Sequence, residues 1–419
     1  MPPLFRALCL AAVAALASLP LCAAETDPAL AEAVAAQRWA LHFDGEYIDG
    51  PGGERVLNAA RAAQFVLVGE DHGFAEVPQF TRALQRALAP EGFRHLVLEI
   101  GPLSAARVEG ALRRDPAALA RLEKETPSWL PFLGWREDAD LAAAAVAGTS
   151  EGHALWGVDQ EFILSPRVHF ARLVALAPDA KARRLAQDYL QSETAAYRRM
   201  VRQHDPDAAQ LTRLGDKDFE ALRQAYTGAS PEAFAIIDLL DSSAAIYRAQ
   251  RTAPFDSNRE RSRAMKFQFM SRYREAAASE GTPRVLFRMG AYHMGRGLSP
   301  TGQFDLGNLA SELAESNGGR SYHLLVLAAG GTVNRWFPFS TDPADKAAPY
   351  AAHAEVDGLG VGPFLDQAKE GQWNLFELAP LRRDTRLLQA GGRAFADLVY
   401  AYDAVLVIDR AHAAHGVAE

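Results

Sequence analysis

Ionisable side chains cluster directly after four apolar segments of the sequence. A histidine can accept a proton from water near neutral pH, and a neighbouring carboxylate can orient its ring and stabilise the charged form. Histidines and carboxylates are also common ligands of divalent metals. The residues that offer this chemistry are Glu70, His72, Glu99, Asp159, Tyr292 and His293.

Each of these residues also has an ordinary structural explanation. A single histidine after a strand is often a hydrogen-bonded turn residue, and an acid there often caps the next helix. Their repeated occurrence after successive apolar segments favours a shared site instead.

The apolar segments predict the elements that would bring these residues together. Near-continuous Val and Leu runs are typical of parallel strands buried on both faces. Helical patterns, such as 74–89, separate the first runs, so the sequence predicts an α/β fold with a mainly parallel central sheet flanked by helices. The carboxyl ends of such strands form the ligand crevice. The predicted strands are 64–69, 93–100, 153–158, 284–289, 322–328 and 404–408.

One long stretch, 166–280, lacks a convincing strand and is rich in Ala, Arg, Gln and Leu. It predicts a large helical insertion over the carboxyl edge of the sheet, where it could serve as a lid. The α/β domain would then consist of residues 25–165 and 281–419.

The amino-terminal segment has the pattern of a signal peptide. A short positive start precedes an apolar stretch and a small-residue cleavage site, which predicts removal of residues 1–24. We therefore expect a periplasmic or secreted protein with no stable membrane span after cleavage. Both cysteines, Cys9 and Cys22, lie in this segment, so the mature chain would have no disulfide or thiol chemistry.

Composition and motifs exclude several functions. The 419 residues carry 44 Lys and Arg against 52 Asp and Glu, a net charge of −8, which argues against nucleic acid as a partner. The sequence GLSPT at 297–301 lacks the final glycine of a hydrolase nucleophile elbow. The glycine-rich 358–363 lacks the strand and helix of a dinucleotide loop, and HExxH and P-loop motifs are absent.

Several short motifs resemble those of a known family. They are GExHG at 69–73, VLE at 97–99, the segment 129–136, GVD at 157–159, Arg261 with Met265, and GxxH at 290–293. Together they resemble the erythromycin esterase family, within a wider group that includes ChaN-type haem-binding proteins and Tiki/TraB-type proteases. The resemblance extends over 65–409, and the single residue between Glu70 and His72 resembles the wider group.

This resemblance implies roles for the site residues. His72 and His293 would face each other across the crevice, with His293 as the base and His72 polarising the substrate. Glu99 would orient one histidine, Arg261 would supply a cationic contact, and Glu70 would support its loop. Asp159 and Tyr292 would complete the substrate-binding side.

We therefore expect an exported hydrolase of an ester, lactone or related acyl bond, acting on a small-molecule substrate without a covalent nucleophile or a cofactor. A metal-dependent hydrolase or protease could use the same residues with zinc, manganese or cobalt. A periplasmic binding protein for haem or another small molecule could use His72 or His293 as an axial ligand. Trp129, Phe132 and Trp135 could belong to the core or line an apolar pocket. Oligomeric state is left open by the sequence.

Overall fold

The computed structural model describes residues 27–150, 152–203, 208–335 and 342–419. The predicted signal peptide at 1–24 lies outside these residues. Within them, no helix has the length and apolar character needed to cross a membrane.

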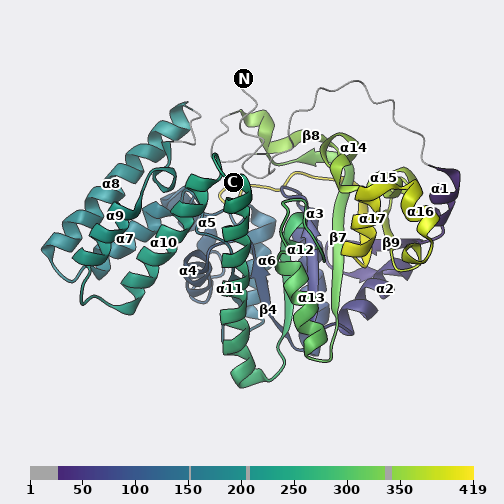
Figure 1. Ribbon diagram of the computed structural model, residues 1–419, viewed down its shortest axis with the longest axis horizontal. Coiled ribbons are helices and arrows are strands. Elements are labelled where there is room, and N and C mark those ends of the chain that lie inside the picture. Colours follow the sequence, from purple (N-terminus) through teal and green to yellow (C-terminus); the bar gives the residue numbers. More distant parts are fainter. Residues whose placement is uncertain (1–26, 151, 204–207, 336–341) are drawn as a thin grey trace.

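A mixed sheet of ten strands forms the centre of the molecule and confirms the predicted α/β class (Figure 1). Its strand order is β2-β1-β9-β10-β7-β3-β6-β4-β5, with β8 paired to β7. Six strands run parallel, and they correspond one for one to the six apolar runs of the sequence. They are β3 (Phe65–Glu70), β4 (Phe93–Leu98), β5 (Leu155–Gly157), β6 (Arg284–Gly290), β7 (Ser321–Val333) and β10 (Ala404–Ala411).

Four antiparallel strands extend the sheet beyond the predicted set. They are β1 (Arg38–Phe43), β2 (Ile48–Asp49), β8 (Ala348–Ala351) and β9 (Trp373–Glu377). Strand β7 also continues through a glycine pair to reach β8. A Cβ atom at Gly331, whose φ is 120°, would lie 2.0 Å from the carbonyl oxygen of Ala411, so this close strand pairing requires glycine.

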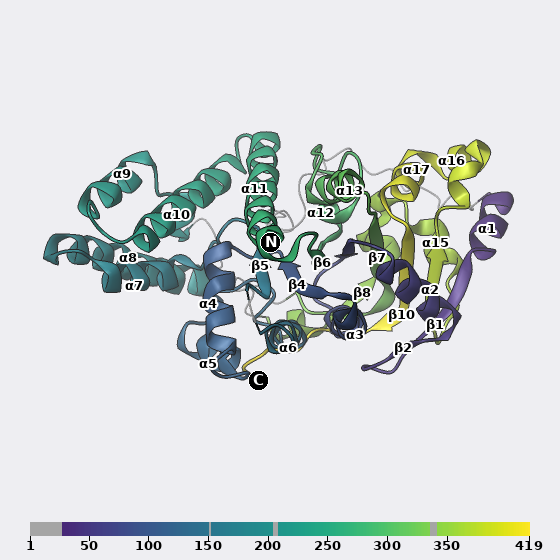
Figure 2. The same cartoon turned by 90° about the horizontal axis from the view of Figure 1, so that it is seen from below.

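Helices cover both faces of the sheet. In Figure 2, α11 and α13 lie on one face and α3 and α6 on the other. The helices before β6 are α1 (Pro28–Ala35), α2 (Gly50–Arg61), α3 (Glu76–Leu88), α4 (Pro102–Leu112), α5 (Ala118–Glu125), α6 (Arg136–Ala147), α7 (Pro166–Leu176), α8 (Ala180–Gln203), α9 (Asp216–Ala225), α10 (Pro231–Ala249) and α11 (Pro254–Glu280). Those after β6 are α12 (Ala291–Met294), α13 (Leu306–Ser316), α14 (Ala352–Glu355), α15 (Gly362–Gln367), α16 (Thr385–Ala390) and α17 (Gly392–Ala401).

The stretch predicted as a helical insertion contains helices and no strand in its described residues. Helices α7 to α10 project beyond the β5 end of the sheet (Figures 1 and 2) and enclose a second core that includes Phe170, Phe219 and Leu240. Helix α11 instead packs Met265 and Phe269 into the core of the sheet. The domain boundaries and the lid role stay predictions.

A buried carboxylate joins the second core to the sheet. Glu161, which is fully buried, accepts hydrogen bonds from Leu103 N at 2.8 Å and Ser104 Oγ at 2.6 Å on α4. It also contacts His169 Nε2 on α7 at 2.9 Å, and the backbone amide of Glu161 donates a hydrogen bond to Ser243 Oγ on α10 at 2.9 Å. Three helices thus contact one residue.

Replacing His169 by Ala should destabilise the protein by about 3 kcal/mol, because it leaves the buried carboxylate of Glu161 without its hydrogen-bond partner on α7. His412→Ala is the matched control, since His412 contacts Glu76 at 2.6 Å but its side chain is 77% exposed. The control should cost less than about 1 kcal/mol. Free energies of unfolding in urea measure both, and equal losses would contradict this role of Glu161.

Candidate active site

The predicted residues lie at the carboxyl edge of the parallel strands. Glu70 is the last residue of β3, and His72 follows in the next loop. Glu99 comes directly after β4, Asp159 follows β5, and His293 lies in the short helix α12 after β6. The structure brings these five side chains into one network of contacts.

Glu99 lies at the centre of that network. One carboxylate oxygen, Oε1, accepts a hydrogen bond from Arg261 at 2.7 Å and lies 3.6 Å from Nε2 of His293. The other oxygen, Oε2, accepts one from the amide of Gly290 at 2.7 Å and lies 3.5 Å from Nε2 of His72. The two histidines therefore face the same carboxylate, one toward each oxygen.

Each histidine has a second carboxylate behind it. Nδ1 of His72 lies 2.7 Å from Glu70, and Nδ1 of His293 lies 2.7 Å from Asp305. These contacts orient both rings and leave both Nε2 atoms directed at Glu99. Sequence reasoning missed Asp305, which is also the N-cap of α13 and accepts a bond from Leu306 N.

The neighbouring acids raise the pKa of both imidazoles. Burial alone would lower the pKa of His72, but its bonds to Glu70 and Glu99 raise that pKa to about 10. Burial likewise opposes a charge on His293, whereas Asp305 and then Glu99 raise its pKa above the usual 6.5.

Glu99 is shifted in the opposite sense. Burial acts to raise its pKa, but the charges of His293, His72 and Arg261 together hold the pKa well below its usual value. A carboxylate with a lowered pKa therefore lies between two histidine rings with raised pKa values.

A deeper ion-pair chain supports Glu70. Arg288 of β6 donates to Glu70 through Nε at 3.0 Å and lies 2.7 Å from its other oxygen through a second nitrogen. Its remaining nitrogen forms an ion pair with Asp138 of α6. Burial raises the pKa of Asp138 to about 7, although the charge of Arg288 acts to lower it. Sequence reasoning did not include Arg288 or Asp138.

Arg261 reaches the site from α11. It donates to both oxygens of Asp159, at 2.9 and 2.7 Å, in addition to Glu99. Its side chain is 25% exposed, which makes it more accessible than Glu99 at 8%. Asp159 therefore reaches the network through Arg261.

Tyr292 lies beside the network and next to the charge of Asp71. Burial, followed by that charge, raises the pKa of Tyr292. Asp71 itself accepts a hydrogen bond from Tyr350 of β8 at 2.9 Å. No contact between Tyr292 and Glu99 or either site histidine is found in the described residues.

The aromatic residues between β4 and β5 divide between core and site. Trp129 is buried in the core, whereas the ring of Phe132 stacks on His72 with 4.2 Å between centroids. Phe132 and Trp135 also line a pocket of about 220 Å³.

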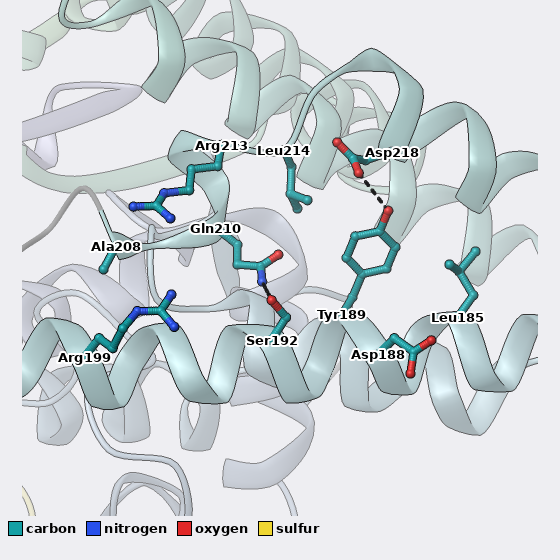
Figure 3. A pocket seen from close by; sticks show the side chains of 10 residues that line it. All are labelled: Leu185, Asp188, Tyr189, Ser192, Arg199, Ala208, Gln210, Arg213, Leu214 and Asp218. Atoms are coloured by element: carbon teal, nitrogen blue, oxygen red, sulfur yellow. Dashed lines mark hydrogen bonds between the residues drawn. The ribbon is translucent and has the colours of Figure 1, made fainter.

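A larger hollow lies elsewhere in the molecule. Its volume is about 460 Å³, and it is lined by α8, η4 (Gln210–Thr212) and α9, including Tyr189, Gln210 and Asp218 (Figure 3). None of the predicted site residues lines it.

Within the described residues, no group of three or more His, Cys, Asp or Glu side chains is arranged to hold a metal ion.

No family model and no curated protein matches this sequence. Three solved structures are similar to it. A protein from Bacillus cereus has 15% identity and a TM-score of 0.56 over 93% of this chain and 98% of that one. A histidine-to-asparagine mutant of the erythromycin esterase EreC, in its open conformation, has 15% identity and a TM-score of 0.55 over 87% and 95%. A succinoglycan biosynthesis protein has 11% identity and a TM-score of 0.55 over 92% and 98%. At these identities the similarity establishes a shared fold, and with the esterase a distant structural relationship.

Gly290→Ala should destabilise the protein by about 1–3 kcal/mol, because the site has no room for a methyl group. Its Cβ would lie 3.0 Å from Nε2 of His72 and 3.3 Å from Oε2 of Glu99. Gly362→Ala is the control, since nothing lies within 4 Å of a Cβ placed there. Chemical denaturation measures both variants, and a Gly290 variant as stable as wild type would show that the contacts are looser than described.

Proposed function

We propose that this chain is an exported hydrolase of an ester, lactone or related acyl bond. One observation carries the proposal: the Nε2 atoms of His72 and His293 face the two oxygens of Glu99, at 3.5 and 3.6 Å. Paired histidines with acidic partners can move a proton and stabilise negative charge around one reacting carbonyl. The distant relationship to a structure named as an erythromycin esterase supports the same reaction class.

In this proposal His293 is the general base. Its bond from Nδ1 to Asp305 fixes the tautomer in which Nε2 carries the lone pair. Neutral His293 takes a proton from water as the water oxygen bonds to the carbonyl carbon, and Asp305 stabilises the imidazolium. When the tetrahedral intermediate collapses, the acyl carbon–oxygen bond breaks and that proton passes to the departing alkoxide. The products are a carboxylic acid and an alcohol.

His72 and Arg261 would stabilise the oxyanion. Both are cationic, and their side chains are 17% and 25% exposed, more than that of Glu99. Glu70 and Arg288 act through His72, so we regard them as positioning residues. Asp159 would hold Arg261 in place, and Tyr292 would border the substrate.

Metal-dependent hydrolysis by the same residues is the second candidate. Histidines that bind a metal usually bond a carboxylate through their other ring nitrogen, as Nδ1 of both His72 and His293 does here. The Nε2 atoms and Glu99 would be the ligands, although the described residues do not show them arranged around an ion, and a bound ion would activate water. Arg261 beside Glu99 disfavours a further cation there.

One experiment separates these functions. The purified protein is treated with a chelator, dialysed, and assayed on a panel of acyl substrates. Unchanged turnover supports the metal-free hydrolase, and turnover lost on chelation and restored by zinc, manganese or cobalt supports the metal enzyme. No turnover, together with a Soret band on adding haem, would favour a binding protein.

His293→Ala should reduce kcat by on the order of 100-fold or more, because it removes the base. His72→Ala should have a comparable effect, and Glu99→Gln should lower the rate while preserving the side-chain shape. His353→Ala, at an exposed position away from the site, is the control. Circular dichroism verifies folding, and a folded His293→Ala variant with wild-type turnover would contradict the mechanism.

The pH dependence of kcat/KM should be bell-shaped. His293 must be neutral to act as a base, so activity should rise with pH through its raised pKa, above 6.5. His72 must be charged, so activity should fall as the pH passes about 10. Asp305→Asn removes the charge that raises the pKa of His293 and should move the acidic limb to lower pH. An acidic limb that stays in place would mean that another group is the base.

A further inference from the structure

The larger hollow, of about 460 Å³, lies outside the proposed active site. Its lining residues come from α8, η4, α9 and the turns beside them, and none belongs to the network around Glu99. Pockets that hold a whole small molecule are typically about 300–1,000 Å³. The hollow is therefore large enough for a ligand of its own.

The floor of the hollow is part of the second core. Ala208 and Leu214 belong to that core, and Tyr189 packs against it. The backbone amide of Gln210 also donates to the buried carboxylate of Glu193 at 3.0 Å, which ties η4 to α8. These contacts hold the two walls of the hollow to each other.

Two arginines mark one end of the hollow. Arg199 comes from α8 and Arg213 follows η4 on the facing wall, and Figure 3 shows both side chains on the same side of the hollow. Both residues are exposed, so a molecule in the hollow can reach them. Within the described part of the chain, Arg199 forms no ion pair with an acidic side chain. Two positive charges that face one space favour an anion between them.

The acids of the hollow lie at its other end. Figure 3 shows Asp188 and Asp218 on the side away from the two arginines. Asp218 already accepts hydrogen bonds at both oxygens, from the hydroxyl of Tyr189 at 2.9 Å and from the amide of Gly215 at 2.9 Å. Asp188 is exposed. Positive and negative groups are thus separated along the hollow, which directs an anion to the arginine end.

Neutral hydrogen-bonding groups lie between the charged ends. The side-chain nitrogen of Gln210 donates to Ser192 Oγ, whereas its side-chain oxygen has no partner among the described residues. The ring of Tyr189 stacks on Phe170 with 5.3 Å between centroids, which fixes its hydroxyl next to Asp218. Amide and hydroxyl groups of this kind suit a ligand with hydroxyl groups better than an apolar one.

We propose that the larger hollow binds a small hydroxylated molecule through an anionic group, a carboxylate or a phosphate, with Arg199 and Arg213 as the counter-charges. Guanidinium groups present fixed pairs of donors that match the oxygens of either anion. The hydroxyl groups of the ligand bond Gln210 and Asp188. This site goes beyond the proposed hydrolase function and does not depend on it.

The test uses glucuronate and glucose 6-phosphate as probes and glucose as their uncharged counterpart. Each is titrated calorimetrically into the full chain at low ionic strength, where screening is weakest. Wild type should bind at least one of the two anions about tenfold or more tightly than glucose, as expected for a charge-assisted hydrogen bond. Preference for one anion identifies the group that the site selects.

Arg199→Gln and Arg213→Gln should each weaken binding of that anion by about tenfold or more, with little change in binding of glucose. Arg198→Gln is the matched control, since Arg198 is exposed on the same helix but does not line the hollow. Circular dichroism verifies that all three variants fold.

The site is overturned if wild type binds neither anion, or binds both no more tightly than glucose. It is also overturned if the double variant Arg199→Gln and Arg213→Gln binds the anion as wild type does, or if Arg198→Gln weakens binding as much as the other two substitutions. Hydrolysis of acyl substrates is a separate readout, because none of these arginines touches the network around Glu99.

Discussion

The site depends on compensating the buried negative charge of Glu99. Removing a carboxylate from water costs several kcal/mol unless cations and hydrogen-bond donors replace the water. Here Arg261, the amide of Gly290 and the two histidine rings surround it. Arg261 and the two histidines each bond a further acid, so basic and acidic groups alternate outward from Glu99. Loss of any one member would leave a neighbouring charge unbalanced.

The parallel sheet is what makes this arrangement possible. Strand β6 lies between β3 and β4, and Glu70 pairs in register with Gly290. This register brings the loop that carries His72 next to α12, which carries His293, and Glu99 lies on the other side of β6, directly after β4. Gly290 is at the point of closest approach, where a methyl group would meet both His72 and Glu99. The chemistry of the site therefore follows from strand order as much as from residue type.

The sequence predicted the parts of the fold that are encoded by continuous apolar runs. The antiparallel strands were not predicted, because β2 has only two residues and β1 mixes apolar residues with Arg38 and His42. The extension of β7 through Gly331 resembles a loop in sequence. In the site, Asp305 could not be distinguished from an ordinary helix cap. Arg288 did carry a signal, since a charge inside a buried strand needs a partner. Its partners, however, are known only from three-dimensional contacts.

The central claim is that one carboxylate raises the pKa of both histidines. The most direct test is an NMR titration of the two imidazoles in wild type and in Glu99→Gln, with resonances assigned by single histidine substitutions. The negative charge of Glu99 raises the pKa of His72 and of His293, so its removal should lower both values together. A shift in only one histidine, or in neither, would contradict the shared carboxylate and the catalytic roles built on it.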